Sequence, residues 1–227
     1  MRRVAQRMGM PITVDVPSCK DRIVFDKIFD LFKEIDAKFS PYKNDSELSR
    51  YNNGELTKNE LSREMKSVIA ACEKYKLETN GYFDAWYKDF DPSGYVKGWA
   101  IKKGGDLIKR LGYETYCISA GGDILAASAG EKVWNIGIQD PKNKLDVLKI
   151  LQISDGAVAT SGSYERGEHI INPKTGIPAT DLVSITVVGP NIISADVYAT
   201  AAFAMGESGV KFVNEHKGFM AYAYPGK

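Results

Sequence analysis

The stretch from Asp91 to Gly112 reads DPSGYVKGWAIKKGGDLIKRLG, which brings an acid, a turn, a cation and a helix start within seven residues. Proline fixes its own φ and pushes the preceding residue out of the helical region, so Asp91-Pro92 ends whatever element comes before it. Apolar residues then recur at helical spacing, and the closing glycine is a natural C-terminal stop. The stretch predicts a helix that begins near Ser93 or Gly94.

Lys97 lies in the first turn of this helix. A cation is unfavourable there because the N-terminal end of the helix macrodipole is positive. The position becomes favourable when an anion is also bound, since exposed backbone N–H groups and a lysine together form a phosphate site. Spacing alone leaves two interpretations open, namely a phosphate-binding lysine and an ordinary solvated surface lysine.

The composition is that of an ordinary globular protein, with 44% hydrophobic and 26% charged residues among 227. Thirty basic residues nearly balance 29 acidic ones, so the net charge of +1 argues against nucleic acid or an anionic membrane as the main partner. The three cysteines are far apart and odd in number, which fits neither a disulfide framework nor a cysteine-based metal site.

The first eight residues, MRRVAQRM, are basic but contain no uninterrupted apolar core, so we do not expect a signal peptide. No later run of residues approaches the length of a membrane span. The chain as given is expected to be cytoplasmic, and a periplasmic location stays open if a leader has been removed.

Several further segments show the periodicity of helices and strands. An N-terminal strand is expected at Ile12–Val16, and amphipathic helices are expected at Phe25–Phe39 and Leu61–Thr79. Four later strands are expected at Tyr116–Ser119, Trp134–Gln139, Leu145–Ile153 and Val183–Val188. A last helix begins with Ser194 as N-cap and runs to Gly206. The irregular order without repeats favours an α+β fold over a doubly wound sheet, in one domain over residues 1–227 with a mixed or antiparallel sheet and packed amphipathic helices.

Three polar or aromatic segments are candidates for a binding site. Tyr82–Tyr87 is an aromatic cluster with one acid, which predicts either a strand of large side chains or one wall of a cleft. Ala159–Arg166 is expected to be a polar loop, and His169–Gly176 a strand that ends in a Pro/Gly turn. His169 is either a hydrogen-bonded structural residue or a group for acid–base chemistry.

Asp196 and Thr200 are four residues apart in the last helix, so both side-chain oxygens project from one face. Hard cations prefer such oxygens, and magnesium typically takes one or two from the protein and completes its shell with phosphates and water. The alternative is an aspartate near the helix start that stabilises the dipole, away from the core.

Taken together, the motifs form an ordered series over nearly the whole chain. The segments in that series are Met8–Met10, Phe39–Tyr42, Asp45–Ser49, Gly81–Asp84, Asp91–Gly98, Ala120–Asp123, Thr160–Gly162, His169–Gly176 and Ala195–Thr200. The series resembles the ApbE family, the FAD:protein FMN transferases, whose fold is related to the T-fold.

The resemblance implies a cleft for FAD and a magnesium site. The FAD contacts that it implies are Met10, Tyr42, Tyr82, Phe83, Asp84, Asp91, Lys97, Asp123 and Ile170. The magnesium ligands that it implies are the Gly94 carbonyl and the side chains of Asp196 and Thr200. In the implied reaction a threonine hydroxyl of an acceptor protein attacks the FMN-side phosphorus of FAD, and AMP leaves.

The resemblance also suggests catalytic roles. Magnesium and Lys97 would neutralise the phosphates. His169 is the best general base because its unperturbed pKa of ~6.5 lies near working pH, and Asp123 is the reserve candidate for this role or for orienting the substrate. Two other functions stay open, a magnesium-dependent FAD pyrophosphatase that yields FMN and AMP, and a non-catalytic FAD-binding protein.

The sequence departs from the family pattern in a few places. Asn172 stands where an aspartate is common, and the chain is short for the family and lacks a lipoprotein leader. Asp155–Thr160 loosely resembles an acceptor motif, which makes self-modification of Thr160 a minor alternative. Nothing in the sequence indicates the acceptor protein or the oligomeric state.

Overall fold

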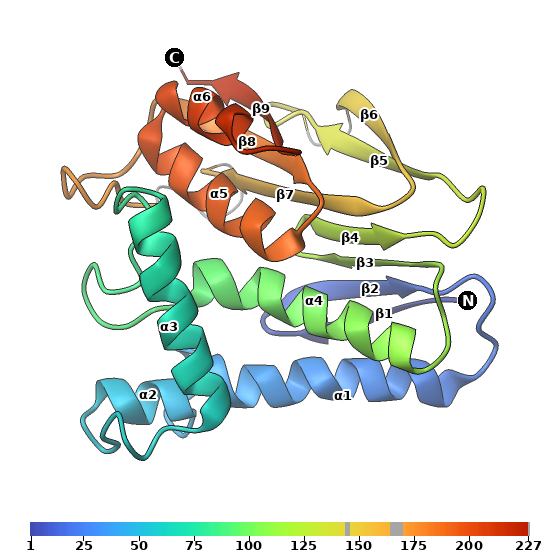
Figure 1. Cartoon of the computed structure of the whole chain (residues 1–227), viewed down its shortest axis with the longest axis horizontal. Helices are drawn as coiled ribbons and strands as arrows, with labels where there is room; N and C mark the ends of the chain where they lie inside the picture. Colours follow the sequence, from blue (N-terminus) through green and yellow to red (C-terminus); the bar gives the residue numbers. More distant parts are fainter. Residues whose placement is uncertain (144–145, 164–169, 227) are drawn as a thin grey trace.

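A computed structural model describes residues 1–143, 146–163 and 170–226. Its largest element is a seven-stranded sheet in the order β1-β2-β3-β4-β7-β8-β9, in which every neighbouring pair is antiparallel (Figure 1). The strands of this sheet are β1 (Arg2–Arg7), β2 (Met10–Asp15), β3 (Tyr116–Ala120), β4 (Asp123–Ala127), β7 (Gly156–Gly162), β8 (Leu182–Gly189) and β9 (Met220–Pro225).

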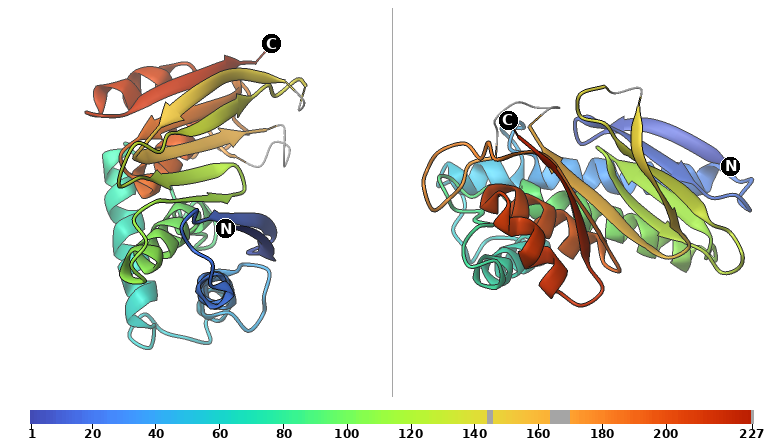
Figure 2. Two further views of the ribbon diagram at one scale, coloured as in Figure 1. Left: turned by 90° about the vertical axis from the view of Figure 1, so that its right-hand side faces the viewer. Right: turned by 90° about the horizontal axis from the view of Figure 1, so that it is seen from above.

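Helices cover one face of the sheet (Figures 1 and 2). Their bounds are α1 (Arg22–Phe39), α2 (Glu47–Asn52), α3 (Arg63–Glu78), α4 (Ser93–Arg110), α5 (Ile192–Met205) and α6 (Ser208–Glu215). Alternate strand residues such as Leu125, Ala157 and Ala159 are buried in the main core beneath α4 and α5. Because side chains alternate between the faces of a strand, their neighbours Ala126 and Val158 lie in a second cluster on the opposite face.

That second face is covered by a hairpin of β5 (Trp134–Gln139) and β6 (Val147–Ile153). Trp134, Ile136 and Leu151 point inward from the hairpin and pack against Ala126 and Val158. The hairpin thus gives a second, smaller core to the part of the sheet that the helices leave open.

The two halves of the main sheet meet at β4 and β7, where the register joins only Ile124 to Val158, Leu125 to Ala157 and Ala126 to Gly156. The neighbouring pair β7 and β8 is joined over six residue pairs. The seam between the N-terminal and C-terminal halves is therefore a short one.

The α+β class, the antiparallel sheet and the expected helices are confirmed. Helix α4 begins at Ser93, directly after Asp91-Pro92, and each of the predicted strands outside residues 169–176 corresponds to an observed one. The Asp91 carboxylate accepts a hydrogen bond from the Ser93 N–H at 2.9 Å, which stabilises the start of α4.

Three local predictions were wrong. Residues 159–162, the described part of the loop expected at 159–166 apart from Ser163, belong to β7, because Ala157 and Ala159 are small enough to be fully buried beneath α5. The described part of the predicted strand at 169–176 is a turn whose only bridge joins Ile171 to Pro178. The N-cap of α5 is Asn191 in place of Ser194. Of the two interpretations of residues 82–87, the strand is not observed, and the segment is one wall of a cleft.

Three further strands were missed. Strands β1 and β9 lie at the two edges of the sheet, and β4 follows directly after Gly121-Gly122, which lie in the motif Ala120–Asp123. No helix in the described part of the chain is both long and apolar enough to cross a membrane.

Helices α4 and α5 approach very closely at Gly98. A Cβ added there would lie 2.9 Å from the Ile192 carbonyl oxygen and 3.1 Å from the Ile193 Cα, and both of these are backbone atoms. The Gly98 N–H donates a hydrogen bond to Asp196 Oδ2 at 2.8 Å, so the same contact also joins the helices through a buried polar group.

We expect Gly98→Ala to lower the free energy of unfolding by about 1–3 kcal/mol, because overpacking between rigid backbones outweighs the gain of ~1 kcal/mol in helix propensity. Urea unfolding measures the change. Gly130→Ala is the matched control, since its Cβ meets no atom within 4 Å and its φ is not positive; its stability should stay the same or rise slightly. A Gly98→Ala protein as stable as the wild type would show that the helices can separate freely.

Candidate active-site cleft

A cleft of about 890 Å³ opens beside the N-terminal end of α4. Its walls come from the start of β2, the loop after α1, the loop 82–91, the end of β7 and helix α5. Eleven of the predicted site residues line it, namely Met10, Tyr42, Tyr82, Phe83, Asp84, Asp91, Gly94, Lys97, Ile170, Asp196 and Thr200. Asp123 is not in the lining but contacts it through Lys97, and His169 lies outside the described residues.

The floor of the cleft contains a buried cluster of charges. Lys97 Nζ lies 2.9 Å from Asp123 Oδ2 and 3.3 Å from Asp196 Oδ1. Asp123 and Asp196 are both fully buried, whereas the Lys97 side chain is 23% exposed toward the cleft. The interpretation of Lys97 as a solvated surface lysine was wrong, because two carboxylates that are distant in sequence hold it.

Burial disfavours the charge on Lys97, but the attraction of Asp123 and then Asp196 outweighs burial, so the pKa of this ammonium is raised and it stays protonated. Burial raises the pKa of Asp196 to about 8, even though Lys97 and the Gly98 N–H favour its charged form. Burial is the largest cause of this shift, and the negative charge of Asp123 adds to it. Two carboxylates face one ammonium, so Asp196 is hard to ionise without a further cation.

Asp123 is oriented by the backbone of β7. Its Oδ1 accepts a hydrogen bond from the Thr160 N–H at 3.1 Å. Within the described residues, no hydrogen bond to its Oδ2 meets the usual geometry. The charge on this oxygen is compensated by the ammonium of Lys97, whose Nζ lies 2.9 Å away. Such a buried carboxylate without a full set of donors is costly unless its ion pair is kept.

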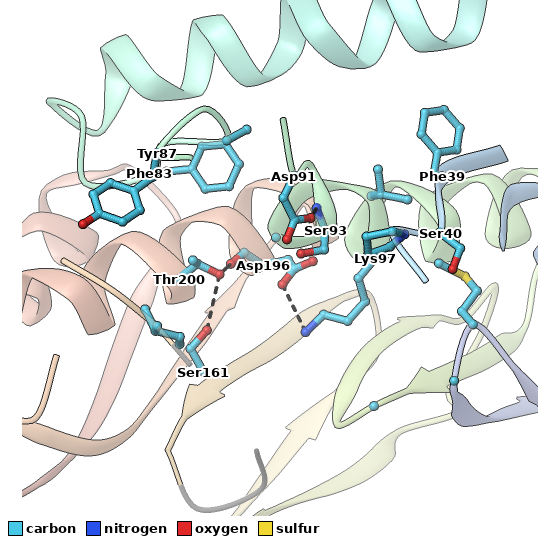
Figure 3. A pocket seen from close by; sticks show the side chains of 18 of the residues that line it. Phe39, Ser40, Phe83, Tyr87, Asp91, Ser93, Lys97, Ser161, Asp196 and Thr200 are labelled. Carbon is cyan, nitrogen blue, oxygen red and sulfur yellow. Dashed lines mark hydrogen bonds and ion pairs between the residues drawn. The ribbon is translucent and has the colours of Figure 1, made fainter. Parts of the chain in front are cut away.

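Asp196 lies deeper than the sequence indicated. It is the fifth residue of α5 and is 1% exposed, so the expectation of an aspartate near the helix start and outside the core was wrong. Figure 3 shows Asp196 and Thr200 projecting from α5 toward Lys97 and Ser161. Thr200 Oγ1 donates to the Asp196 carbonyl at 3.1 Å and lies 3.5 Å from Ser161 Oγ.

Three oxygens of this region fit a hard cation. Gly94 lies against Thr200, since a Cβ at Gly94 would be 3.5 Å from Thr200 Oγ1. The carbonyl of Gly94, the hydroxyl of Thr200 and the carboxyl group of Asp196 are all hard oxygen donors. Among the described residues, no group of three or more His, Cys, Asp or Glu is placed to hold a metal. A cation here would therefore have few protein ligands, which is the pattern of Mg²⁺ completed by phosphate and water.

Helix geometry adds a further point about Gly94. In an α-helix the N–H of Gly98 pairs with the carbonyl of Gly94. Here that N–H donates to Asp196 Oδ2 at 2.8 Å. Because an amide has one hydrogen, sharing it with Asp196 increases the capacity of the Gly94 carbonyl to accept another partner.

Aromatic rings form the opposite wall. Tyr42 is 91% exposed, so its ring is free to stack on a ligand, whereas Phe83 is buried against Gly94. Lys174 Nζ lies 5.5 Å from the centre of the Tyr82 ring, and Tyr87 donates a hydrogen bond to the Gly176 carbonyl at 3.3 Å. The turn at 172–177 is thereby attached to this aromatic wall.

Two more residues that were predicted to contact FAD, Asp84 and Met10, are held in place by neighbouring groups. Asp84 pairs with Lys76 at 2.7 Å and accepts from the Trp86 N–H at 2.9 Å, which fixes the loop after α3. Met10 lies beneath the Gly-Gly turn, where a Cβ on Gly121 would come within 2.8 Å of its sulfur. A side chain at Gly121, whose φ is +55°, would therefore be doubly unfavourable.

Ser161 lies in the lining beside Thr200, and no role was predicted for it. Its segment was singled out as a candidate binding loop at 159–166 and as the motif Thr160–Gly162, without this residue being named. Ser161 follows Ala157 and Ala159 at every second position, so all three lie on the same face of β7. A polar residue that ends such a row of buried alanines can indicate a cavity, and this signal was missed because the segment was expected to be a loop.

Comparison with known proteins agrees with the motif series. The model of the ApbE family matches residues 8–90 and 88–223. A protein of Haemophilus influenzae named FAD:protein FMN transferase is 26% identical over 87% of this chain and 77% of its own length. A protein of Vibrio cholerae with the same name is 34% identical, over 52% of this chain and 39% of its own length. Several of the curated relatives are thus matched over less than half their length.

Solved structures share the fold. The flavin transferase ApbE from Vibrio cholerae superposes with a TM-score of 0.80 over 99% of this chain and 96% of its own, at 23% identity. The ApbE protein from Thermotoga maritima superposes with a TM-score of 0.84 over 98% of this chain and 93% of its own, also at 23% identity. Since the family model covers nearly all residues from 8 to 223, this chain belongs to the ApbE family.

Proposed function

We propose that this chain transfers the FMN moiety of FAD to a threonine hydroxyl of an acceptor protein, with magnesium, and releases AMP. Relatives at 26% and 34% identity carry the name FAD:protein FMN transferase. The observation that carries the proposal is the buried cluster of Lys97, Asp123 and Asp196, in which two carboxyl groups face one ammonium at the floor of a cleft that also holds an exposed aromatic ring.

The cleft has the size and chemistry for FAD. Its volume of about 890 Å³ is within the usual range for a site that holds a cofactor-sized ligand. The isoalloxazine and adenine rings would stack on the aromatic wall at Tyr42 and Tyr82. The pyrophosphate would lie at the N-terminal end of α4, where free N–H groups and the helix dipole favour an anion. Because the lining comes from both halves of the chain, we propose that residues 1–227 act as one domain.

Magnesium, when bound at Asp196, Thr200 and the Gly94 carbonyl, would neutralise charge on the phosphates. The protein's own groups do the positioning. Lys97 presents its ammonium toward the cleft while Asp123 and Asp196 hold it charged, so it can bind a phosphate oxygen without losing its proton. Such transfer depends mainly on positioning and charge stabilisation.

In the proposed step the acceptor's threonine oxygen forms a bond to the FMN-side phosphorus, and the bond from that phosphorus to the bridging oxygen breaks. The electron pair leaves with AMP, and the proton of the threonine hydroxyl passes to a general base. Asp123 is buried behind Lys97 and outside the lining, so we assign it to orienting the lysine. His169 stays the proposed base.

A magnesium-dependent FAD pyrophosphatase would use the same groups with water in place of threonine. A protein that only binds FAD is the third alternative, and the relatives named FAD:protein FMN transferase favour an enzyme over it. The distinction between the two enzymes therefore depends on the acceptor.

The first test is incubation with FAD and Mg²⁺, with and without a protein that presents a flavinylation threonine. We expect AMP release, followed by chromatography, to depend on the acceptor, whose intact mass should rise by one FMN. Removal of Mg²⁺ with a chelator should stop both. AMP release at the same rate without acceptor would favour the pyrophosphatase, and an FMN adduct on this chain itself would reopen the question of Thr160.

The second test is Asp196→Asn, which keeps the shape and an acceptor for the Gly98 N–H but removes the charge. We expect Mg²⁺-dependent turnover to fall by about 100-fold or more, since loss of a metal site removes several kcal/mol of charge stabilisation. The control is Asp106→Asn, whose carboxylate pairs with Lys102 at the surface of α4. Unchanged turnover in Asp196→Asn would remove this residue from the metal site.

The third test addresses the buried charges. Lys97→Gln leaves Asp123 without its counter-ion, so without Mg²⁺ the free energy of unfolding should fall by about 3–5 kcal/mol. Added Mg²⁺ should recover part of this loss, which urea unfolding measures. Lys103→Gln breaks a half-exposed pair with Glu64 and should cost no more than about 1 kcal/mol. Equal stability of the two variants would mean that the Lys97 cluster is not strongly buried.

A further inference from the structure

Thr79 is a fully buried polar residue outside the cleft and is at the C-cap of α3. Its hydroxyl donates a hydrogen bond to the Tyr75 carbonyl at 2.8 Å and accepts one from the Phe83 N–H at 3.0 Å. The first bond is local to the helix. The second reaches four residues ahead, past the helix end, into the loop that forms the aromatic wall.

The bond to Phe83 fixes a sharp change of direction. Between the two residues the chain passes through positive φ at Asn80 (52°) and Gly81 (79°). The N–H of Phe83 is buried, so without Thr79 it has no access to water. A buried N–H without a partner is costly, and the loop can relieve that cost by moving outward.

Phe83 links this turn to the floor of the cleft. Its ring packs against the start of α4, because a Cβ on Gly94 would lie 3.2 Å from Phe83 Cε2. The neighbouring residues Tyr82 and Asp84 also line the cleft. A shift of the Phe83 backbone therefore moves the aromatic wall relative to the N-terminal end of α4.

The other partner of Thr79 connects to α5. Tyr75, whose carbonyl accepts from the Thr79 hydroxyl, has its own hydroxyl 2.8 Å from Ser194 Oγ on α5. Helix α5 also carries Asp196 and Thr200. The Thr79 hydroxyl thus joins the aromatic loop to a residue that already contacts the proposed cation-binding helix.

We propose that Thr79 is a positioning residue for the FAD cleft, because its hydroxyl sets the distance between the aromatic wall and the phosphate end of the site. This inference rests on the proposed function. It differs from a role in helix capping alone, which the backbone already supplies: the N–H groups of Thr79 and Gly81 bond to the carbonyls of Tyr75 and Lys76.

The experiment compares Thr79→Val, which keeps the shape without the hydroxyl, with Thr79→Ser, which keeps the hydroxyl. Binding of FAD in the presence of Mg²⁺ is followed by the change in flavin fluorescence. We expect the Kd of Thr79→Val to rise about tenfold or more, and that of Thr79→Ser to stay within about threefold of the wild type. In the transfer reaction KM for FAD should rise by a larger factor than kcat falls. Hydrogen exchange at the Phe83 amide should be fast in the valine variant and slow in the serine variant.

Three results would overturn the proposal: wild-type FAD affinity in a folded Thr79→Val protein, equal loss in the serine and valine variants, or an unchanged Phe83 amide exchange. If Thr79→Val does not fold, Thr79→Ala replaces it with the same expectations. If the wild-type protein binds no FAD, the proposed function is overturned, and the role of Thr79 in flavin binding with it. If the wild-type protein binds FAD and Thr79→Val binds it equally well, only the role of Thr79 is overturned.

Discussion

The close contact between α4 and α5 at Gly98 is the constraint on which the site depends. Only a residue without a side chain lets the two helices approach until the Gly98 N–H reaches Asp196. That approach places Lys97, one residue earlier on α4, beside the same carboxylate. A buried carboxylate from the C-terminal half and an ammonium from the N-terminal half therefore meet because one position in α4 is a glycine.

The buried charges follow from this geometry. Asp123 enters from the start of β4 and competes with Asp196 for one ammonium, and burial, with the negative charge of Asp123 as a smaller cause, raises the pKa of Asp196. An ion pair of this kind is weak evidence for stability, since desolvation of both partners offsets much of their attraction. Its retention in the floor of a large cleft is better explained by chemistry that needs charge held in a fixed place.

Much of this arrangement could be predicted from the sequence, because it depends on residues that are only a few positions apart. The helix over residues 93–110 follows from a proline before it and a regular apolar stripe within it, both of which act over a few residues. The ordered motifs likewise brought eleven residues to one cleft. What the sequence could not show were partners across the fold: that Lys97 pairs with Asp123 and Asp196 depends on sheet order and on a glycine contact about a hundred residues away.

The elements that were predicted incorrectly also have physical explanations. Residues 159–162 of β7 were predicted to start a loop because their segment is rich in polar residues and glycine. The burial of Ala157 and Ala159 beneath α5, which makes the segment a strand, depends on contacts that are distant in sequence. The start of α5 was placed at Ser194, although Asn191 is an equally good cap three residues earlier, and this shifted Asp196 from the core to the first turn. Edge strands β1 and β9 carry weak patterns because one side of each has no neighbour in the sheet.

The short seam between β4 and β7 has a consequence for how the molecule holds together. Three residue pairs join the two halves of the sheet there, and the cleft takes its lining from both sides of that seam. A molecule bound in the cleft would link the two halves of the sheet across the β4–β7 pair, where the fewest residue pairs join them. Occupancy of the cleft would then slow separation of the halves, so that the resistance of the chain to proteases and to pulling would report on the ligand as directly as any assay of turnover.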